Sequence, residues 1–355
     1  MKNSVDYIII GQGVSGTFLS YYLHKAGKDI LVIDEFKPFT ATKIASGVIN
    51  PVTGRRVVQT WLIDDIMPFA WNAYSEMGNE LNAGLIQQCN VLSFHGNAQM
   101  QKAYEDRTLE ENKYLKEVEN INELKNYFNF YFGVGETSPC YLADMQTLQT
   151  KWREKLLNED LLLEEKFDFD SLDIQSSEKI RYKNFTAQKI IFCDGVEGTE
   201  NKFFQNLPFA KNKGEALIAE IPDLPRTNIY KQSLTIVPWK NNLFWIGSQY
   251  EWNYANAQPS AAFRIKAEMQ LQQWLRLPYK ILEHWAAERP ANIERRPFVG
   301  LHPQFSNIGI LNGMGTKGCS LAPFFAHQFT QYLIHQTPIN PLADVARFTK
   351  ILARS

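Results

Sequence analysis

Apolar residues near the start of the chain follow two different periods. Tyr7–Ile10 form a short continuous apolar run, which is typical of a strand buried on both faces. A helical pattern covers residues 15–25 and stops before Gly27, a residue suited to the end of a helix. A second apolar run, "DILVIDE", follows at 29–35. The order predicts a strand, a loop, a helix and a parallel second strand.

The loop between the first strand and the helix has the spacing G-x-G-x-x-G. In that motif Gly11 makes the tight turn, Gly13 lets backbone approach a pyrophosphate, and Gly16 lets the helix lie close to the strand. Asp34 ends the second run, where an acid that binds ribose is expected. A dinucleotide site is therefore predicted, either for FAD or for NAD, with a fortuitous strand–helix–strand unit as the alternative. Its residues are Gly11, Gly13, Val14, Ser15, Gly16, Asp34 and Glu35.

The segment after the second strand, "EFKPFTATKIASGVINPVTGRR", is rich in small and turn-forming residues. A long loop of this composition suits a close approach of backbone to a large planar ring. A plain surface loop is the alternative. The residues expected to touch the ring are Thr42, Ala45, Ser46 and Gly47.

Two later segments favour the larger cofactor. "AQKIIFCDGVEG" reads as a buried strand that ends in a turn placed to touch a cofactor. "SNIGILNGMGTKGCSLAPFFAHQFTQYLI" reads as a strand, a second glycine-rich loop and a helix whose N-terminus supplies partial positive charge. The further cofactor-binding candidates are Phe167, Asp194, Gly195, Gly313, Met314, Gly315, Thr316, Lys317 and Gly318.

With these motifs the chain resembles the D-amino-acid oxidase family of FAD-dependent oxidoreductases, close in pattern to glycine oxidase and sarcosine oxidase. The resemblance lies in the first glycine loop and in "ASGVINP", "IFCDGV", "LTIVPWKNNLFWIGSQYEW", "ERPANIERRPFVGLHP" and "NGMGTKGCSLAP". The run from Glu288 to Pro323 is its most specific part, whereas 57–140 and 206–284 match weakly.

The resemblance implies an α/β fold, with a Rossmann-type FAD-binding domain and an inserted substrate domain of antiparallel sheet. We expect residues 1–85, 141–205 and 285–355 to form the FAD-binding domain, and 86–140 with 206–284 to form the substrate domain. Within the latter, "GEALIAEI", "SLTIVPW" and "LFWIGSQY" read as strands, the last two joined by a turn at 240–242. This sheet would be one wall of the active site, opposite the flavin.

The family's chemistry implies oxidation of a primary or secondary amine, such as an amino acid, by hydride transfer from the α-carbon to flavin N5 and hydrolysis of the imine. Arg289 matches the arginine that binds the substrate carboxylate in a two-pronged contact. An ion pair of Arg289 with Glu288 or Glu294 is the alternative. Thr235 stands where D-amino-acid oxidase has a tyrosine that also holds the carboxylate, so we expect a wider pocket or a different substrate.

Three more basic residues and a cysteine lie near the second glycine loop. We expect Lys317 to stabilise negative charge on the reduced flavin, with a solvent-facing lysine as the alternative. Arg295 and Arg296 are expected to be surface or interdomain charges. Family members with covalent flavin use a cysteine in this neighbourhood, but Cys319 falls inside the start of the helix, so non-covalent FAD is expected.

The charge balance limits the partners. A formal net charge of −1 gives no global basic field for nucleic acid or for an anionic membrane. Four widely separated cysteines and no metal-ligand spacing favour a cytoplasmic protein without a metal site, and no apolar stretch has the length of a membrane span. We expect a small-molecule amine as substrate, with oxygen or another electron acceptor.

Three alternative functions stay open on the sequence. "NGMGTKGCSLAP" also resembles the oxidase that acts on a modified uridine side chain in tRNA. The family further includes flavoprotein subunits of larger amine dehydrogenases. A nicotinamide dehydrogenase is the weakest alternative, because it leaves the second glycine loop without a role.

Overall fold

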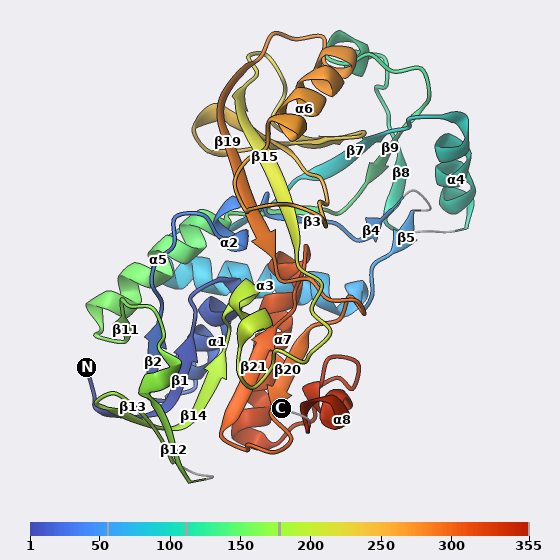
Figure 1. The fold of residues 1–355 in the computed structure, drawn as a ribbon. Helices are drawn as coiled ribbons and strands as arrows, with labels where there is room; N and C mark the ends of the chain where they lie inside the picture. The colour runs from blue at the N-terminus through green and yellow to red at the C-terminus, as the bar shows by residue number, and fades with distance from the viewer. Residues whose placement is uncertain (55–56, 111–112, 177–178, 354–355) are drawn as a thin grey trace.

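The chain forms two large sheets, one drawn above the other in Figure 1. The structure is a computed structural model that describes residues 1–54, 57–110, 113–176 and 179–353. The first sheet has the order β11-β2-β1-β14-β13-β12, with β21 also beside β14 and β20 beside β21. The strands β11, β2, β1, β14 and β21 run parallel, and β12, β13 and β20 are antiparallel to their neighbours. The bounds are β1 Ser4–Ile10, β2 Ile30–Ile33, β11 Leu162–Leu163, β12 Leu172–Ser176, β13 Lys179–Tyr182, β14 Phe185–Phe192, β20 Phe298–Leu301 and β21 Ile308–Asn312.

The centre of this sheet is apolar because it is covered on both faces. Ile8 of β1 lies in register with Leu31 of β2 and Ile190 of β14, and all three are buried. Continuous apolar strands of this kind are what a parallel sheet between two layers requires. The α/β fold with a parallel, Rossmann-like sheet is therefore confirmed.

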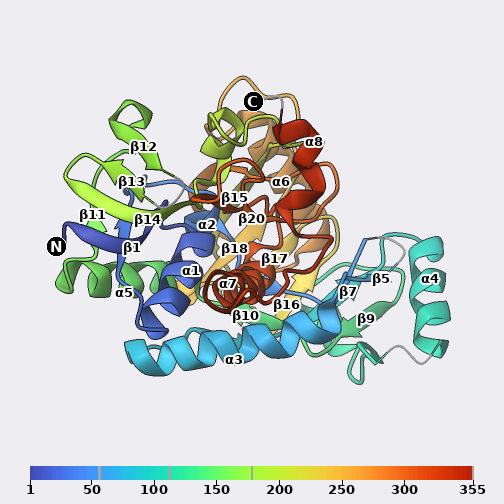
Figure 2. The same cartoon turned by 90° about the horizontal axis from the view of Figure 1, so that it is seen from below.

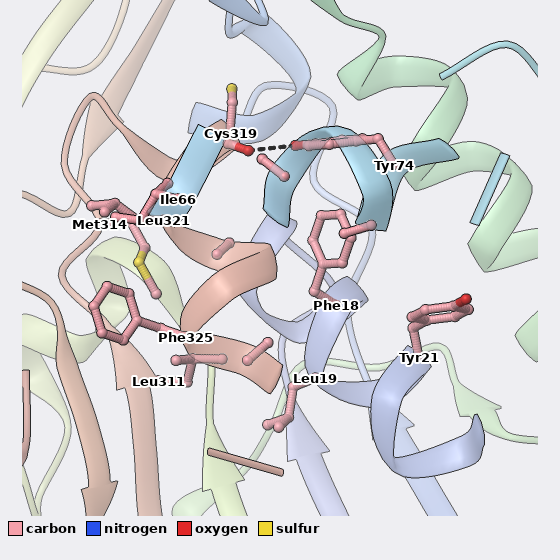
Figure 3. Packing of buried hydrophobic residues seen from close by; sticks show 14 of the residues in the cluster. Phe18, Leu19, Tyr21, Ile66, Tyr74, Leu311, Met314, Cys319, Leu321 and Phe325 are labelled. Carbon is pink, nitrogen blue, oxygen red and sulfur yellow. Dashed lines mark hydrogen bonds between the residues drawn. The ribbon is translucent and has the colours of Figure 1, made fainter. Parts of the chain in front are cut away.

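Four helices lie on one side of the first sheet, three against its strands and the longest packed on the outside of these; Figure 2 shows the longest helix in profile. They are α1 (Val14–Lys25), α3 (Ile63–Leu81), α5 (Met145–Asn158) and α7 (Gly318–His335). Along α3 the buried residues recur at helical spacing, which turns one stripe towards α7. Tyr74 in this stripe donates a hydrogen bond of 2.9 Å to the carbonyl of Cys319, and Figure 3 shows this bond beside Phe18 and Ile66.

The second sheet has the order β19-β15-β18-β17-β16-β7-β9-β8 and is largely antiparallel. The exception is β7, which runs parallel to β16. Helix α6 (Ala261–Trp274) covers one face, and on the other face the buried Trp245 donates a hydrogen bond of 2.9 Å to the carbonyl of Ile44 in α2 (Ala41–Ile44). The bounds are β7 Asn90–Phe94, β8 Leu115–Glu117, β9 Val134–Thr137, β15 Asn212–Glu220, β16 Asn228–Lys231, β17 Thr235–Pro238, β18 Leu243–Gly247 and β19 Lys280–Arg289.

The turn predicted between β17 and β18 is a short 3₁₀ segment, Lys240–Asn242, between two antiparallel strands. Asn241 and Asn242 both have positive φ, which asparagine tolerates better than most residues. The remaining strands and α-helices of the described residues are β3 Val48–Ile49, β4 Val52–Thr53, β5 Val58–Gln59, β6 Ile86–Gln88, β10 Tyr141–Ala143, α4 Ala98–Leu109 and α8 Thr349–Leu352. The domain boundaries given above stay a prediction. Within the described residues, no helix combines the length and apolarity needed to cross a bilayer.

Candidate active site

The first glycine loop is packed too tightly to admit side chains at two of its three glycines. Gly11 has a φ of 92°, and a Cβ there would lie 2.6 Å from the carbonyl oxygen of Cys193. A Cβ on Gly16 would lie 1.8 Å from the carbonyl oxygen of Gly11. Gly13 has room, because its nearest neighbour would be the Thr42 hydroxyl at 3.4 Å. The loop therefore lies against the end of β14, and its open side is at Gly13.

Asp34 is held by the protein from three directions. Its carboxylate accepts hydrogen bonds from the backbone N–H of Gln12 and of Phe36, each at 2.9 Å. The third donor is Nη1 of Arg153 in α5, at 2.8 Å. A carboxylate has about four lone-pair sites, so roughly one is left for a ligand hydroxyl. Glu35 beside it is exposed and pairs with Lys37 at 3.0 Å.

The segment predicted as a ring-binding loop contains a short helix instead. Helix α2 begins after Thr40, whose hydroxyl accepts a hydrogen bond from the N–H of Lys43, so Thr42 is helical. The Thr42 hydroxyl accepts a hydrogen bond of 2.9 Å from the N–H of Val14 and so joins α2 to the first glycine loop. Ala45 and Ser46 follow the helix and are half-buried. A Cβ on Gly47 would lie 1.9 Å from the Ala143 carbonyl oxygen, so strand packing already accounts for this glycine.

The second glycine loop meets the first. Gly313 and Gly315 have φ of 75° and 57°, the left-handed region that glycine adopts without strain. A Cβ on Gly318 would lie 3.2 Å from Val14 Cγ1, which sets the N-termini of α1 and α7 side by side. Neither helix has a side-chain cap or an acidic residue in its first turn. Two positive helix ends therefore meet at one place, which suits a diphosphate.

Asp194 and Gly195 complete this edge of the sheet. The carboxylate of Asp194 accepts hydrogen bonds of 2.8 Å from the side-chain amides of Asn312 and Asn201. Burial raises the pKa of Asp194 from 3.8 to about 6. A Cβ on Gly195 would meet nothing within 4 Å, so the turn faces open space. We call the two glycine loops, Asp34 and the turn 194–195 the cofactor edge.

The cofactor edge fits a dinucleotide. It lies at the carboxyl ends of β1, β14 and β21, which are parallel neighbours and so end at one edge of the sheet. The room at Gly13 and Gly195 leaves the backbone accessible to a ligand. Phe167 behaves differently, since its ring packs on Tyr182 and Phe192, and any cofactor contact would fall to its main chain.

Arg289 is the last residue of β19, in the second sheet. Its guanidinium donates hydrogen bonds to the Asn212 side chain at 2.9 Å, to the Gln249 carbonyl at 3.0 Å and to the Ser248 hydroxyl. It lies across Gly214, where a Cβ would be 1.8 Å from Nη2. We call Arg289 and these four residues the substrate wall. Burial lowers the pKa of Arg289, but an arginine stays charged at neutral pH.

The ion pair considered as an alternative role for Arg289 is not formed. Within the described residues, no carboxylate lies within 4 Å of its guanidinium. Glu288 pairs with Lys211 at 3.2 Å, and Glu294 pairs with Arg347 at 3.2 Å. Arg289 therefore has neutral hydrogen-bond acceptors and, among the described residues, no counter-ion.

The other catalytic candidates lie on two sides of this wall. Thr235 begins β17 and is paired in register with Gly247, the residue before Ser248. Lys317 directly precedes α7, and its ammonium lies 3.4 Å from the Thr60 hydroxyl. Burial and then the neighbouring arginines lower the pKa of Lys317. The contact of Lys317 with a flavin stays a prediction.

The structure adds polar residues that the sequence did not indicate. Behind Asp34, Arg153 donates a hydrogen bond to the side-chain oxygen of Gln12. The side-chain amides of Gln12 and Gln149 each donate to the backbone carbonyl of the other residue, at 3.0 and 2.6 Å. Asn292 donates hydrogen bonds to the carbonyls of Gly313 and Arg296, at 2.8 and 2.7 Å. Asn312 could have been found, because it is a polar residue at the end of a buried strand directly before a glycine loop. Nothing local marks Arg153.

The fold and site define an FAD-dependent oxidoreductase: residues 6–332 match the model of the DAO family, described as FAD dependent oxidoreductase, and the chain belongs to that family. Among solved structures it is similar to glycine oxidase from Geobacillus kaustophilus, with a TM-score of 0.80, 15% identity and 98% of each chain covered. It is also similar to iminodiacetate oxidase from Chelativorans sp. BNC1, with a TM-score of 0.74, 17% identity and coverage of 95% of this chain and 97% of the other.

A third structural relative is L-proline dehydrogenase from P. horikoshii, with a TM-score of 0.79, 13% identity and 99% of each chain covered. One curated relative, the uncharacterized oxidoreductase YurR of Bacillus subtilis (strain 168), is 39% identical over 56 residues. That match spans 16% of this chain and 15% of the length of the relative. These likenesses support the fold at low identity and leave the substrate to be argued from the site.

Proposed function

We propose that the protein oxidises an amine that carries a carboxylate, such as an amino acid, with FAD as the hydride acceptor. The observation that carries this proposal is the state of Arg289, a half-buried guanidinium bound by neutral acceptors alone. An arginine placed in this way gains most from a ligand carboxylate, because a charged acceptor binds it more strongly than a carbonyl does. Relatives named for glycine, iminodiacetate and proline support the same class of substrate.

The residues of the chain would act chiefly by positioning. Arg289 would fix the carboxylate and thereby the α-carbon next to it, while Asn212 and Ser248 hold the guanidinium in place. A bound flavin supplies the chemistry by accepting the hydride that leaves the α-carbon. The amine nitrogen loses a proton, and water converts the resulting imine to a carbonyl compound and a free amine. Thr235 could donate a hydrogen bond from the neighbouring strand.

We extend the proposal to non-covalent binding of FAD. Cys319 lies buried in the first turn of α7, and burial raises the pKa of its thiol to about 12. The thiol is therefore protonated at neutral pH and is a poor nucleophile towards a flavin. Acid precipitation should leave the yellow colour in the supernatant, and colour retained in the protein pellet would contradict this extension.

The experiment is an anaerobic titration of the purified yellow protein. Glycine, sarcosine, proline, iminodiacetate and a panel of D- and L-amino acids are added in turn, and the flavin absorbance is followed. Bleaching of the flavin bands by at least one compound is the expected result. A flavin that none of these compounds reduces, although dithionite does reduce it, would overturn the proposal.

A further inference from the structure

Arg296 lies close to the second glycine loop in the chain fold, and among the described residues no carboxylate lies within 4 Å of its guanidinium. Its guanidinium stacks on the ring of Trp61 at 4.2 Å, and Trp61 stacks in turn on Phe325 of α7 at 5.7 Å with the planes 13° apart. The acceptor found for this guanidinium among the described residues is the carbonyl of Arg295, at 3.2 Å. The guanidinium therefore lies over the Trp61 ring, and most of its N–H donors have no acceptor among the described residues.

Asn292 ties Arg296 to the active site. Its side-chain amide donates hydrogen bonds to the carbonyls of Gly313 and Arg296, and its side-chain oxygen accepts one of 3.2 Å from the N–H of Arg296. The backbone from Arg289 therefore turns back at Asn292 and runs beside the second glycine loop. The N–H of Gly315 completes this contact with a bond of 3.1 Å to the carbonyl of Pro290.

A second cation lies against the same support. Lys317 contacts the hydroxyl of Thr60, and Arg296 lies over the ring of the next residue, Trp61. The two positive side chains therefore contact adjacent residues. Within the described residues, neither Lys317 nor Arg296 forms an ion pair with a carboxylate. Glu294 acts electrostatically on Arg296, but it is itself paired with Arg347 at 3.2 Å. An anionic ligand would reduce the repulsion between Arg296 and Lys317.

We infer that Arg296 forms a second anion-binding position, and that the substrate carries a second anionic group, a carboxylate or a phosphate, besides the one that Arg289 binds. The part of the inference that concerns the substrate rests on the proposed function. It narrows the substrate from any amino acid to an amine with two acidic groups. The contacts of Arg296 with Trp61, and of Trp61 with Phe325, support the guanidinium at this position.

The test uses three compounds that contain no amine, so binding is measured without turnover. Propionate has one anionic group, succinate adds a second carboxylate, and 3-phosphonopropionate adds a phosphonate in its place. Each is titrated by calorimetry into the FAD-loaded protein, into Arg296→Met and into Arg296→Lys. The control variant is Arg264→Met, which removes an exposed arginine paired with Glu268 on α6.

We expect the wild-type protein to bind at least one of the two dianions about 10-fold more tightly than propionate, a ratio typical of one added charged hydrogen bond. The better of the two identifies the second group as carboxylate or phosphate. Arg296→Met should erase the preference and leave propionate binding unchanged, Arg296→Lys should restore part of it, and Arg264→Met should keep it. Equal binding of all three by the wild type, or a preference that survives Arg296→Met, would overturn the inference, whatever the amine titration shows.

Discussion

The cofactor edge and the substrate wall treat buried charge in opposite ways. At the cofactor edge each carboxylate already has protein donors: Asp34 has Arg153 and two backbone N–H groups, and Asp194 has two side-chain amides. At the substrate wall the acceptors that Arg289 finds among the described residues are all neutral. In the first region the protein itself supplies partners for the charged groups. The second region carries a positive charge that an anionic ligand can balance.

This difference separates two tasks. A cofactor that stays bound needs a binding site of fixed geometry, and the free energy needed to order that site is spent once, during folding. A substrate that must enter and leave needs a charge that is held in place but not neutralised. Each variant below changes one region, and where both ligand affinities are measured the result shows whether the two regions are independent.

The largest effect is expected at the tightest contact of the cofactor edge. Gly16→Ala forces a Cβ to within 1.8 Å of the Gly11 carbonyl oxygen, and α1 must move away from the loop. We expect the free energy of unfolding to fall by about 3 kcal/mol and FAD to be lost on gel filtration. Gly84→Ala, at a site with open space, is the control. If Gly16→Ala retained FAD, close packing at Gly16 would not be required for FAD binding at the cofactor edge.

A pH dependence is expected from Asp194. Because its pKa is raised from 3.8 to about 6, the folded protein keeps a proton that the unfolded chain has already released. Stability is therefore highest below pH 3.8 for this group and falls as the pH rises to about 6, by roughly 2–3 kcal/mol. Urea unfolding across this window should show the slope in the wild type and not in Asp194→Asn. An equal slope in both proteins would assign it to another group.

The support behind Asp34 should matter next. Arg153→Met leaves the Asp34 carboxylate, which is 20% exposed, without its charged partner. We expect FAD to bind about 30-fold more weakly, or about 2 kcal/mol, while the affinity for propionate stays the same in the FAD-loaded protein. Arg181→Met, which breaks an exposed pair with Asp173, is the control. Loss of both affinities together would show that the two regions are coupled.

The local patterns predicted the parts of the fold that depend on neighbouring residues. The apolar run at 7–10, the helix at 15–25 and the hairpin around 240–242 are confirmed, because burial period, glycine and turn residues act within a few positions. The helix at 41–44 was missed, although Thr40 is a good capping residue, because small residues dominate that stretch.

Long-range pairs could not be predicted in this way. Arg153 reaches Asp34 across 119 residues, and the parallel pairing of β7 with β16 joins segments far apart in the chain. The cofactor contact of Phe167 stays a prediction, and its ring packs on Tyr182 of β13 and Phe192 of β14. Such contacts depend on which elements the topology brings together, and one sequence does not reveal this.

The smallest effect is expected at the substrate wall from a single methyl group. Gly214→Ala displaces the guanidinium of Arg289 that lies across it, but the long side chain can shift. We expect propionate to bind about 10-fold more weakly and FAD affinity to be unchanged. Propionate binding is measured by calorimetry and FAD binding by flavin absorbance. A change in FAD affinity alone would contradict the assignment of Gly214 to the substrate wall.

The most direct test of the central claim compares matched amines with and without a carboxylate, sarcosine with dimethylamine and glycine with methylamine, in the wild type and in Arg289→Leu. The rate of anaerobic flavin reduction is measured at low substrate concentration. We predict that the wild type prefers the carboxylate-bearing amine of at least one pair by about 100-fold or more, and that Arg289→Leu abolishes this preference while FAD stays bound. A preference that survives in Arg289→Leu, or a wild type without one, would contradict the account.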